Sequence, residues 1–368
     1  MVMHSQLNML MEVNKMTRLN IKTISPVHIG TGDVYMSSEY YQDTISMNNK
    51  NYSVFKRINL IKYFNSLDKN SQDRFSKDLL NDKYKLPKLS DEFLRYYSYN
   101  RCDSRPNPGN QINENIKVLD KPYIPGSSIK GAIETALLYN SLTNEDIHEI
   151  FSGGGFDEKF ANKFFSSNGL PQNSILRFLQ ISDSTTAPHP YIYDIKTIKA
   201  NKKGGFSKVF NLYYETILGK NLVSTLTTNF DSRLFKKLNL EDKKYLLDLD
   251  YIKESIYNFS NDYMENELEF IEKYGKENSM VKEMYKFYRA YKKKNSIDSP
   301  FLKIGSTSGL LATTINLKIK HVDSYYFKRV KNSSRTKKAK YEYPVTRRIS
   351  NKTGYPTGWI QLSFNEDD

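Results

Sequence analysis

The stretch YIPGSSIKG, residues 123–131, decides the fold class of this sequence, because an extended segment passes directly into a helix there. The small residues after its proline are typical of a helix N-terminus. The helix is predicted over residues 129–142, and its apolar side chains recur at helical spacing at Ile129, Ile133, Ala136 and Leu137. A strand that leads at once into an amphipathic helix indicates a mixed α and β fold.

Further strands are predicted on both sides of this stretch. Residues 18–24 alternate apolar and polar side chains as a half-buried strand does, and a hairpin turns at Asn48 and Asn49 before a short helix over residues 59–64. Residues 240–294 are mainly helical. The other predicted strands cover 40–46, 51–55, 176–181, 192–198, 209–214, 222–227 and, alone or after a short helix, 310–319. This order predicts an α+β fold of two ferredoxin-like domains rather than a parallel doubly wound sheet.

The domain boundaries are predicted from shifts in composition. Residues 1–17 lack a strand pattern and are interpreted as an N-terminal extension. An N-terminal ferredoxin-like domain follows over 18–190, with a charged, partly helical insertion at 66–116. A C-terminal ferredoxin-like domain is predicted over 191–368, and it contains the helical region 240–294 and a basic tail at 328–352.

The charge of the chain favours a polyanionic partner. Lys and Arg total 55 against 41 acidic residues, which gives a formal net charge of +14. The tail at 328–352 holds ten basic residues and one acidic residue, so it carries nine of the fourteen excess charges. Nucleic acid is the leading candidate partner. Biased codon usage is the alternative explanation for the overall charge. A solvated arm without a partner is the alternative for the tail.

Several classes of protein are disfavoured by what the sequence contains. The chain has 1 Cys and 5 His, with no two His at metal-ligand spacing, so neither a metal nor another cofactor is expected. No apolar run approaches the roughly 18 residues of a membrane helix, and the N-terminus lacks a secretory pattern. A cytoplasmic protein without membrane contact is therefore expected.

Three glycine-containing loops carry the candidate binding residues. In residues 126–131 the backbone N–H groups and Lys130 stand at a helix N-terminus, where a phosphate can be held, and an ordinary Ser-capped helix is the alternative. The loop 305–309 follows Lys303, and it either approaches a second phosphate or base or simply connects two elements. The loop 28–33 ends the first strand and holds His28.

Catalysis has weaker support in these loops. His28 would be the general base of an RNA-cleaving site, but a histidine hydrogen-bonded within its own loop explains it as well. Asp33 and Asp183 are single carboxylates in turns, where they more often accept hydrogen bonds from nearby amides. No catalytic residue is assigned.

Five motifs together resemble the RAMP superfamily of CRISPR proteins: PVHIGTG at 26–32, YIPGSSIKG at 123–131, ISDS at 181–184, the segment 305–314 and GW at 358–359. More narrowly, the chain resembles the Csm-type subunits that sit at the 3′ end of the CRISPR RNA (crRNA) in the type III-A effector complex. The resemblance covers residues 18–361, and YIPGSSIKG is its most specific part. The insertion 66–116 matches least, and the loop 305–309 holds fewer glycines than this family usually has there.

The resemblance implies two ferredoxin-like domains related to the RNA-recognition fold and a non-catalytic role in antiviral defence. The protein would bind the 3′ part of the crRNA, contact other Csm subunits and especially the backbone RAMP subunit, and support target RNA binding and crRNA trimming by host nucleases. The alternatives are a metal-independent endoribonuclease of the same superfamily and a purely architectural subunit. The expected RNA contacts are His28, Gly30, Gly32, Gly126, Ser127, Ser128, Lys130, Gly131, Lys303, Gly305, Gly309, Arg347 and Arg348.

Overall fold

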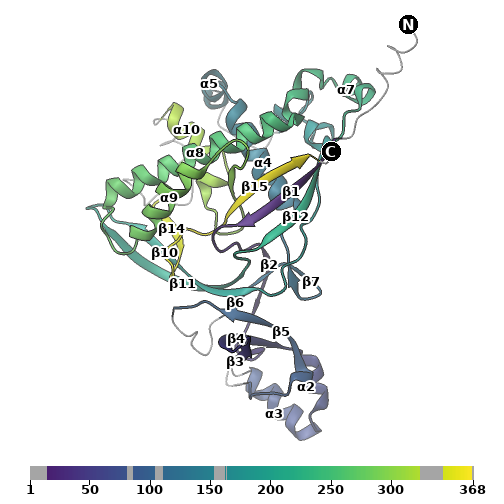
Figure 1. Cartoon of the computed structure of the whole chain (residues 1–368), viewed down its shortest axis with the longest axis vertical. Coiled ribbons are helices and arrows are strands. Elements are labelled where there is room, and N and C mark those ends of the chain that lie inside the picture. The colour runs from purple at the N-terminus through teal and green to yellow at the C-terminus, as the bar shows by residue number, and fades with distance from the viewer. Residues whose placement is uncertain are drawn as a thin grey trace.

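Two large sheets form the frame of the molecule (Figure 1). The computed structural model describes residues 15–80, 86–103, 111–152, 162, 164–323 and 343–366. The first sheet has five strands, in the spatial order β13 (Phe301–Lys303), β15 (Trp359–Glu366), β1 (Lys15–Thr23), β12 (Asn221–Thr228) and β9 (Leu179–Ile181). All of its pairings are antiparallel. Strand β1 therefore pairs with β15 near the C-terminus on one side and with β12 from the middle of the chain on the other.

Helices cover one face of the first sheet because its strands alternate in character. In β1, Leu19 and Ile21 are buried while Arg18 and Lys22 are exposed. Helix α4 (Gly126–Ser141) packs on α8 (Leu249–Tyr274), and α9 (Lys282–Lys294) packs on α8 in turn. The apolar stripes of these helices and the inner face of the sheet form one continuous core. No described helix is both long and apolar enough to cross a membrane.

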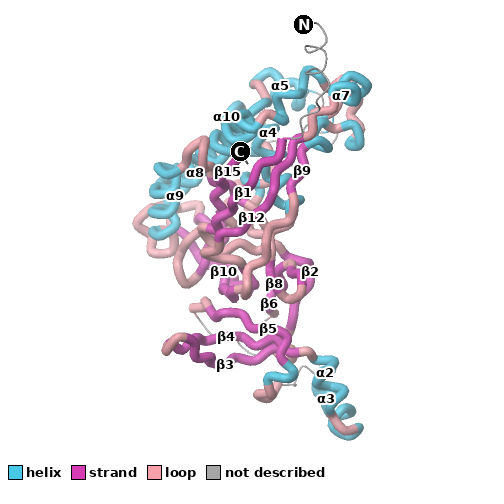
Figure 2. Tube along the Cα trace, turned by 45° about the vertical axis from the view of Figure 1, so that its right-hand side comes forward, coloured by secondary structure: helices cyan, strands magenta, loops and turns pink. Residues whose placement is uncertain are grey.

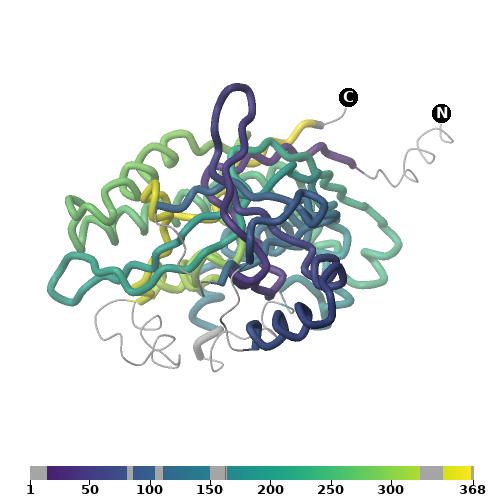
Figure 3. The backbone as a smooth tube through the Cα atoms, turned by 90° about the horizontal axis from the view of Figure 1, so that it is seen from below, coloured from purple at the N-terminus to yellow at the C-terminus, as the bar shows by residue number. Residues whose placement is uncertain are grey.

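The second sheet has eight strands and curls below the first one. Its path is β2 (Gly30–Tyr35), β6 (Ile112–Asn115), β11 (Phe206–Thr216), β10 (Tyr191–Ala200), β5 (Leu94–Asn100), β4 (Lys50–Ile58) and β3 (Tyr40–Met47), and β14 (Thr346–Ser350) also pairs with β10. The β3–β4 hairpin extends beyond the rest of the sheet (Figure 3). It turns at Asn48 and Asn49, whose φ angles of 49° and 58° suit the twist of a tight hairpin.

Short elements complete the described chain. Helices α2 (Leu60–Ser66) and α3 (Lys69–Leu80) lie beside β3, β4 and β5, at the opposite end of the molecule from α5 (Asn144–Ser152) and α7 (Ser232–Leu238) (Figure 2). The remaining elements are β7 (Lys117–Val118), β8 (Lys121–Pro122), α10 (Asn316–Val322) and the 3-10 helices η1 (Asp91–Phe93), η2 (Pro171–Asn173), η3 (Ile175–Phe178), η4 (Glu241–Leu247) and η5 (Leu310–Ala312).

The predicted α+β class is confirmed, as are the hairpin, the helix after residue 125 and most strands. Two predicted strands differ from the structure. Residues 175–178 form η3, because the Ser174 side chain accepts a hydrogen bond from Leu176 N and caps a helical turn. Residues 310–312 and 316–322 are helical, and the hydroxyls of Thr313 and Thr314 bond back to carbonyls four residues earlier.

The division into domains at residue 190 stays a prediction. Strands from both sides of that boundary share each large sheet, since β1 pairs with β12 and β5 pairs with β10. The predicted insertion contains β5 and β6, which are strands of the second sheet. Of the predicted extension, residues 1–14 lie outside the described residues, and so does the part of the basic tail from 328 to 342.

Candidate functional site

Three loops that are distant in sequence are hydrogen-bonded to one another beside the C-terminal end of β11. They are residues 25–29 after β1, residues 304–309 after β13 and residues 357–358 before β15, and we call them the loop junction. Ser306 N donates to His28 O at 3.0 Å, and Gly358 N donates to Pro26 O at 2.8 Å. Gly305 has a φ of +88°, and a Cβ there would lie 2.3 Å from His28 O. Glycine is therefore required at residue 305 by packing against the His28 loop.

His28 is fixed inside this junction. Its side chain is 3% exposed, and Nδ1–H donates to the carbonyl oxygen of Glu215 at 2.7 Å. The ring also meets Tyr214 edge to face at 4.8 Å. Burial lowers its pKa and keeps the ring neutral. This geometry does not favour a general base, because the ring lacks access to solvent. A direct RNA contact by His28 stays a prediction.

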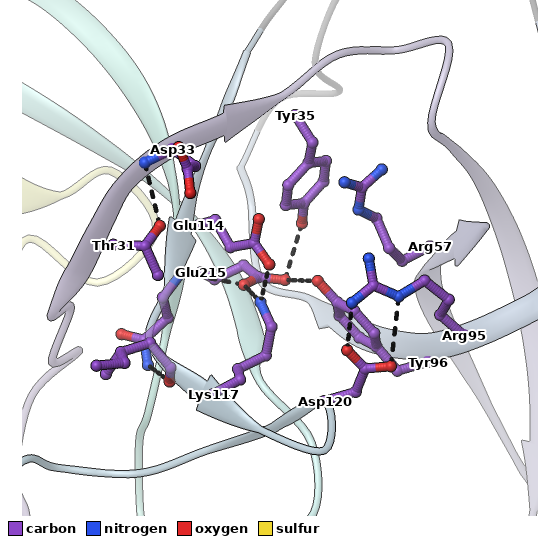
Figure 4. A network of polar contacts seen from close by, with 12 residues as sticks. Thr31, Asp33, Tyr35, Arg57, Arg95, Tyr96, Glu114, Lys117, Asp120 and Glu215 are labelled. Carbon is purple, nitrogen blue, oxygen red and sulfur yellow. Dashed lines mark hydrogen bonds and ion pairs between the residues drawn. The ribbon is translucent and has the colours of Figure 1, made fainter. Parts of the chain in front are cut away.

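A buried carboxylate holds the second sheet together next to the junction (Figure 4). Glu215 is 0% exposed and accepts from the hydroxyls of Tyr35 at 3.0 Å and Tyr96 at 2.8 Å. Asn115 N donates to its other oxygen at 3.1 Å, and Lys117 Nζ forms an ion pair with the same oxygen. Burial, with the nearby Glu215 carboxylate, raises the pKa of both tyrosines. Glu215 therefore fixes β2, β5, β6 and β11 relative to one another.

The segment 123–131 lies against residues 181–184, as the N-terminus of α4. Gly126 is buried, and a Cβ there would lie 2.0 Å from the carbonyl oxygen of Ile181. Gly126 N donates to Asp183 Oδ1 at 2.9 Å. A carboxylate thus occupies the helix end at which the sequence predicts a phosphate, and it would repel one. Close packing against Ile181 O therefore explains why residue 126 is a glycine, independently of any RNA contact.

The other predicted contacts of that segment remain accessible to different degrees. Ser127 and Gly131 are exposed, while Ser128 and Lys130 are half-buried. Burial lowers the pKa of Lys130, and Glu134 one turn later opposes that shift. RNA contacts at these residues stay predictions, with Ser127, Lys130 and Gly131 better placed than Gly126.

The predicted contacts near the C-terminus divide into buried and accessible residues. Lys303 and Arg347 are 7% and 9% exposed and line a cavity under the loop 305–309, so they are not part of the exposed surface of the junction. Arg348 is half-buried, and its Nη1 donates to Ser306 O at 3.1 Å. Gly30, Gly32 and Gly309 are exposed, the first two in β2 and Gly309 at the end of the loop 304–309.

An aromatic surface that the sequence reasoning missed lies on the second sheet. We define the aromatic surface as Tyr52 of β4, Tyr97 and Tyr99 of β5, His189, and Tyr191 of β10, all half-buried. The rings of Tyr97 and His189 stack at 4.1 Å, and those of Tyr99 and Tyr191 stack at 5.4 Å. Tyr52 meets Tyr99 edge to face at 5.7 Å. The β5–β10 register, which pairs Tyr99 with Tyr191, places the rings on one side of the sheet.

Basic side chains flank the aromatic surface. The Arg101 guanidinium lies 5.6 Å from the ring centroid of Tyr191. Burial lowers the pKa of His189, and the nearby Lys220 and Lys121 lower it further. The His189 ring is therefore neutral at neutral pH and can stack like the tyrosines. The sequence did hold a signal for this surface. Tyr97 and Tyr99 are two residues apart, and residues two apart in a strand lie on the same face of the sheet.

Comparisons with known proteins agree on one family. The model of the RAMP superfamily matches residues 20–338. The curated protein "CRISPR system Cms protein Csm5" of Streptococcus thermophilus is 25% identical over 254 residues, which cover 63% of this chain and 70% of that protein. The protein of the same name from Methanocaldococcus jannaschii is 23% identical over 397 aligned residues, which cover 93% of this chain and 88% of the relative.

Two solved structures share the fold. A chain of a Csm–crRNA–target RNA ternary complex from a type III-A CRISPR-Cas system matches with a TM-score of 0.66 and 21% identity, covering 94% of this chain and 100% of that one. The crystal structure of T. onnurineus Csm5 matches with a TM-score of 0.59 and 19% identity, covering 93% and 99%.

Proposed function

The chain belongs to the RAMP superfamily, and from this premise we propose that it is the crRNA-binding subunit at the 3′ end of the guide in a type III-A CRISPR effector (Csm) complex. Two curated relatives carry the name Csm5, and one similar chain belongs to a complex of Csm proteins with crRNA and target RNA. The proposed partners are therefore crRNA, target RNA and other Csm subunits, the backbone RAMP subunit above all. We place this complex in the cytoplasm, where it would support crRNA maturation by host nucleases.

The aromatic surface with its flanking basic residues is the single observation that carries this proposal. Tyrosine and neutral histidine rings offer flat faces to unpaired bases, and such stacking contributes about 1–3 kcal/mol per base without strong sequence preference. Arg101, Lys121 and Lys220 supply the positive charge that a phosphate backbone requires. A guide strand needs this combination, because its protein must hold many different spacer sequences.

Exposed residues of the loops extend the proposed contact set. Gly30, Gly32 and Gly309 are exposed and let a backbone approach closely, and Arg348 adds a cation at the loop 304–309, where its Nη1 donates to Ser306 O. Ser127, Lys130 and Gly131 form a separate proposed contact at the start of α4. We propose no catalytic role, and the burial of His28 is the main argument against the endoribonuclease alternative.

The proposal is tested by measuring the affinity of the full chain for an RNA with the 3′ part of a crRNA. Tyr99→Leu and Tyr191→Leu each remove a stacking face without changing charge. Each should raise the Kd by about fivefold to 150-fold, which corresponds to about 1–3 kcal/mol, while the slope of log Kd against log salt stays the same. Tyr245→Leu is the matched control, because Tyr245 is 44% exposed and lies on η4 away from this surface.

Equal affinity of all three variants and the wild type would refute base stacking on this surface. The same samples are checked for RNA integrity over several hours. Cleavage products that disappear in His28→Ala would support the endoribonuclease alternative instead.

A further inference from the structure

A cavity of about 300 Å³ lies under the loop 305–309. Its walls come from α8, α9 and β14, and we call it the chamber. The side chains that matter for its chemistry are Glu267, Tyr288, Lys303, Thr307, Ser308 and Arg347. The volume is at the lower end of the range for small-molecule sites. Gly309 and Arg348 of the proposed contact set lie at its wall, whereas the buried side chains named above have no role in that set.

The chamber holds more positive than negative charge. Glu267 is 0% exposed and forms an ion pair with Arg347, with Nε 2.6 Å from Oε2. Lys303 is also buried, and its Nζ donates to the hydroxyl of Tyr263 at 3.2 Å. Among the described residues that line the chamber, Glu267 is the sole carboxylate and faces two buried cations. A buried charge without a counter-ion is costly, by several kcal/mol, so the chamber favours an incoming anion.

Two buried hydroxyl groups of the loop 305–309 also favour an anionic ligand. Thr307 is 4% exposed and Ser308 is 3% exposed, and both residues line the chamber. Neither Thr307 Oγ1 nor Ser308 Oγ has a hydrogen-bond partner in the described structure. A buried hydroxyl without a partner costs about 1–3 kcal/mol, and native proteins leave few of them. Both groups can donate to an oxyanion.

We propose that the chamber binds a phosphate group of an RNA strand, with Lys303 providing the charge and the hydroxyls of Thr307 and Ser308 donating hydrogen bonds. This inference rests on the proposed function, because the RNA is its source of phosphate. The position of the chamber supports that source. Ser306 and Gly309 of the same loop are exposed, so a strand on the loop junction lies next to the chamber. The phosphate comes either from within the strand or from its 3′ end.

Binding should depend on pH through Lys303. Burial lowers the pKa of Lys303 to about 8, Glu267 opposes the shift, and Arg347 and Arg348 add to it. The other groups that face it are Tyr263 and Trp359, whose ring centroids lie 5.2 and 5.8 Å from Nζ, and Tyr288 across the chamber. The ammonium is present at pH 7 and largely lost at pH 9, so phosphate binding should weaken between these values.

The experiment compares three RNAs of one sequence with the full-length protein: one with a 3′-phosphate, one with a 3′-hydroxyl and one circular. Lys303→Met should raise the Kd tenfold or more at pH 7 and should remove the weakening between pH 7 and pH 9. Lys286→Met is the matched control, because it removes the same charge from an exposed side chain of α9. Thr307→Val removes one donor at nearly constant volume, which keeps the test valid if Lys303→Met folds poorly.

The three RNAs distinguish the sources of the phosphate. An equal loss for all of them assigns an internal phosphodiester, and a loss confined to the 3′-phosphate RNA assigns the strand end. If the wild type binds all three RNAs and Lys303→Met and Thr307→Val bind them no more weakly than Lys286→Met, the phosphate site in the chamber is refuted and the proposed function stands. If the wild type binds none of the three RNAs, the proposed function and the phosphate site are both refuted.

Discussion

Replacing Glu215 by Gln should destabilise the fold strongly. The Glu215 carboxylate is 0% exposed and accepts from Tyr35, Tyr96, Asn115 N and Lys117 (Figure 4). A glutamine has nearly the same shape, but it removes the charge that pairs with Lys117. If its amide nitrogen faces Lys117 and Asn115 N, donors meet donors, and if it faces Tyr35 and Tyr96, their hydroxyls must accept and lose the acceptor for their own hydrogens. Breaking a buried ion pair by removing one partner typically costs 3–5 kcal/mol. Lys117 keeps a second partner in Glu114 at 2.8 Å, so we expect about 3 kcal/mol.

The assay is urea unfolding of the full-length protein followed by circular dichroism. Glu114→Gln is the matched control, because it removes the same charge from the same lysine, while its side chain is 19% exposed and Lys117 keeps Glu215. This control should change the free energy of unfolding by at most about 1 kcal/mol. A Glu215→Gln variant within that limit of the wild type, with an unchanged dependence on urea, would refute the view that Glu215 holds the second sheet together.

Further predictions concern the glycines of α4 and the buried lysine. Gly126→Ala should destabilise the protein by more than 1 kcal/mol, since its Cβ would lie 2.0 Å from Ile181 O, whereas Gly131→Ala, with open space around it, should stabilise α4 by about 0.5–1 kcal/mol. Thermal melts of both variants check this, and similar changes for the two would contradict it. For Lys303, the folded-state pKa of about 8 lies below the ordinary 10.5, so the unfolded chain binds more protons between these values. The free energy of unfolding of the wild type relative to Lys303→Met should therefore rise by about 3 kcal/mol between pH 8 and 10.5 in phosphate-free buffer, and a constant difference would refute the shift.

Local patterns in the sequence were sufficient for much of the fold. The β3–β4 hairpin follows from the strand-like segments 40–46 and 51–55 on either side of Asn48 and Asn49, because asparagine adopts the left-handed conformation more readily than most other residues. Helix α4 follows from its 3.6-residue spacing and the small residues at its start. The strand predicted at 176–181 failed at its first half, because a single side-chain cap at Ser174 favoured a helical turn there.

The sequence by itself determined the fold class, the resemblance to the RAMP superfamily and the glycines around which the loops are built, since these depend on residues close together in the chain. Tertiary structure alone decided which candidate residues reach solvent and which rings meet. Lys303 and Arg347 became chamber walls because α8 brings Glu267 to them. Tyr99 met Tyr191 because β5 pairs with β10. Such contacts join residues tens to hundreds of positions apart, and their registers are fixed by burial of the whole core rather than by any local preference.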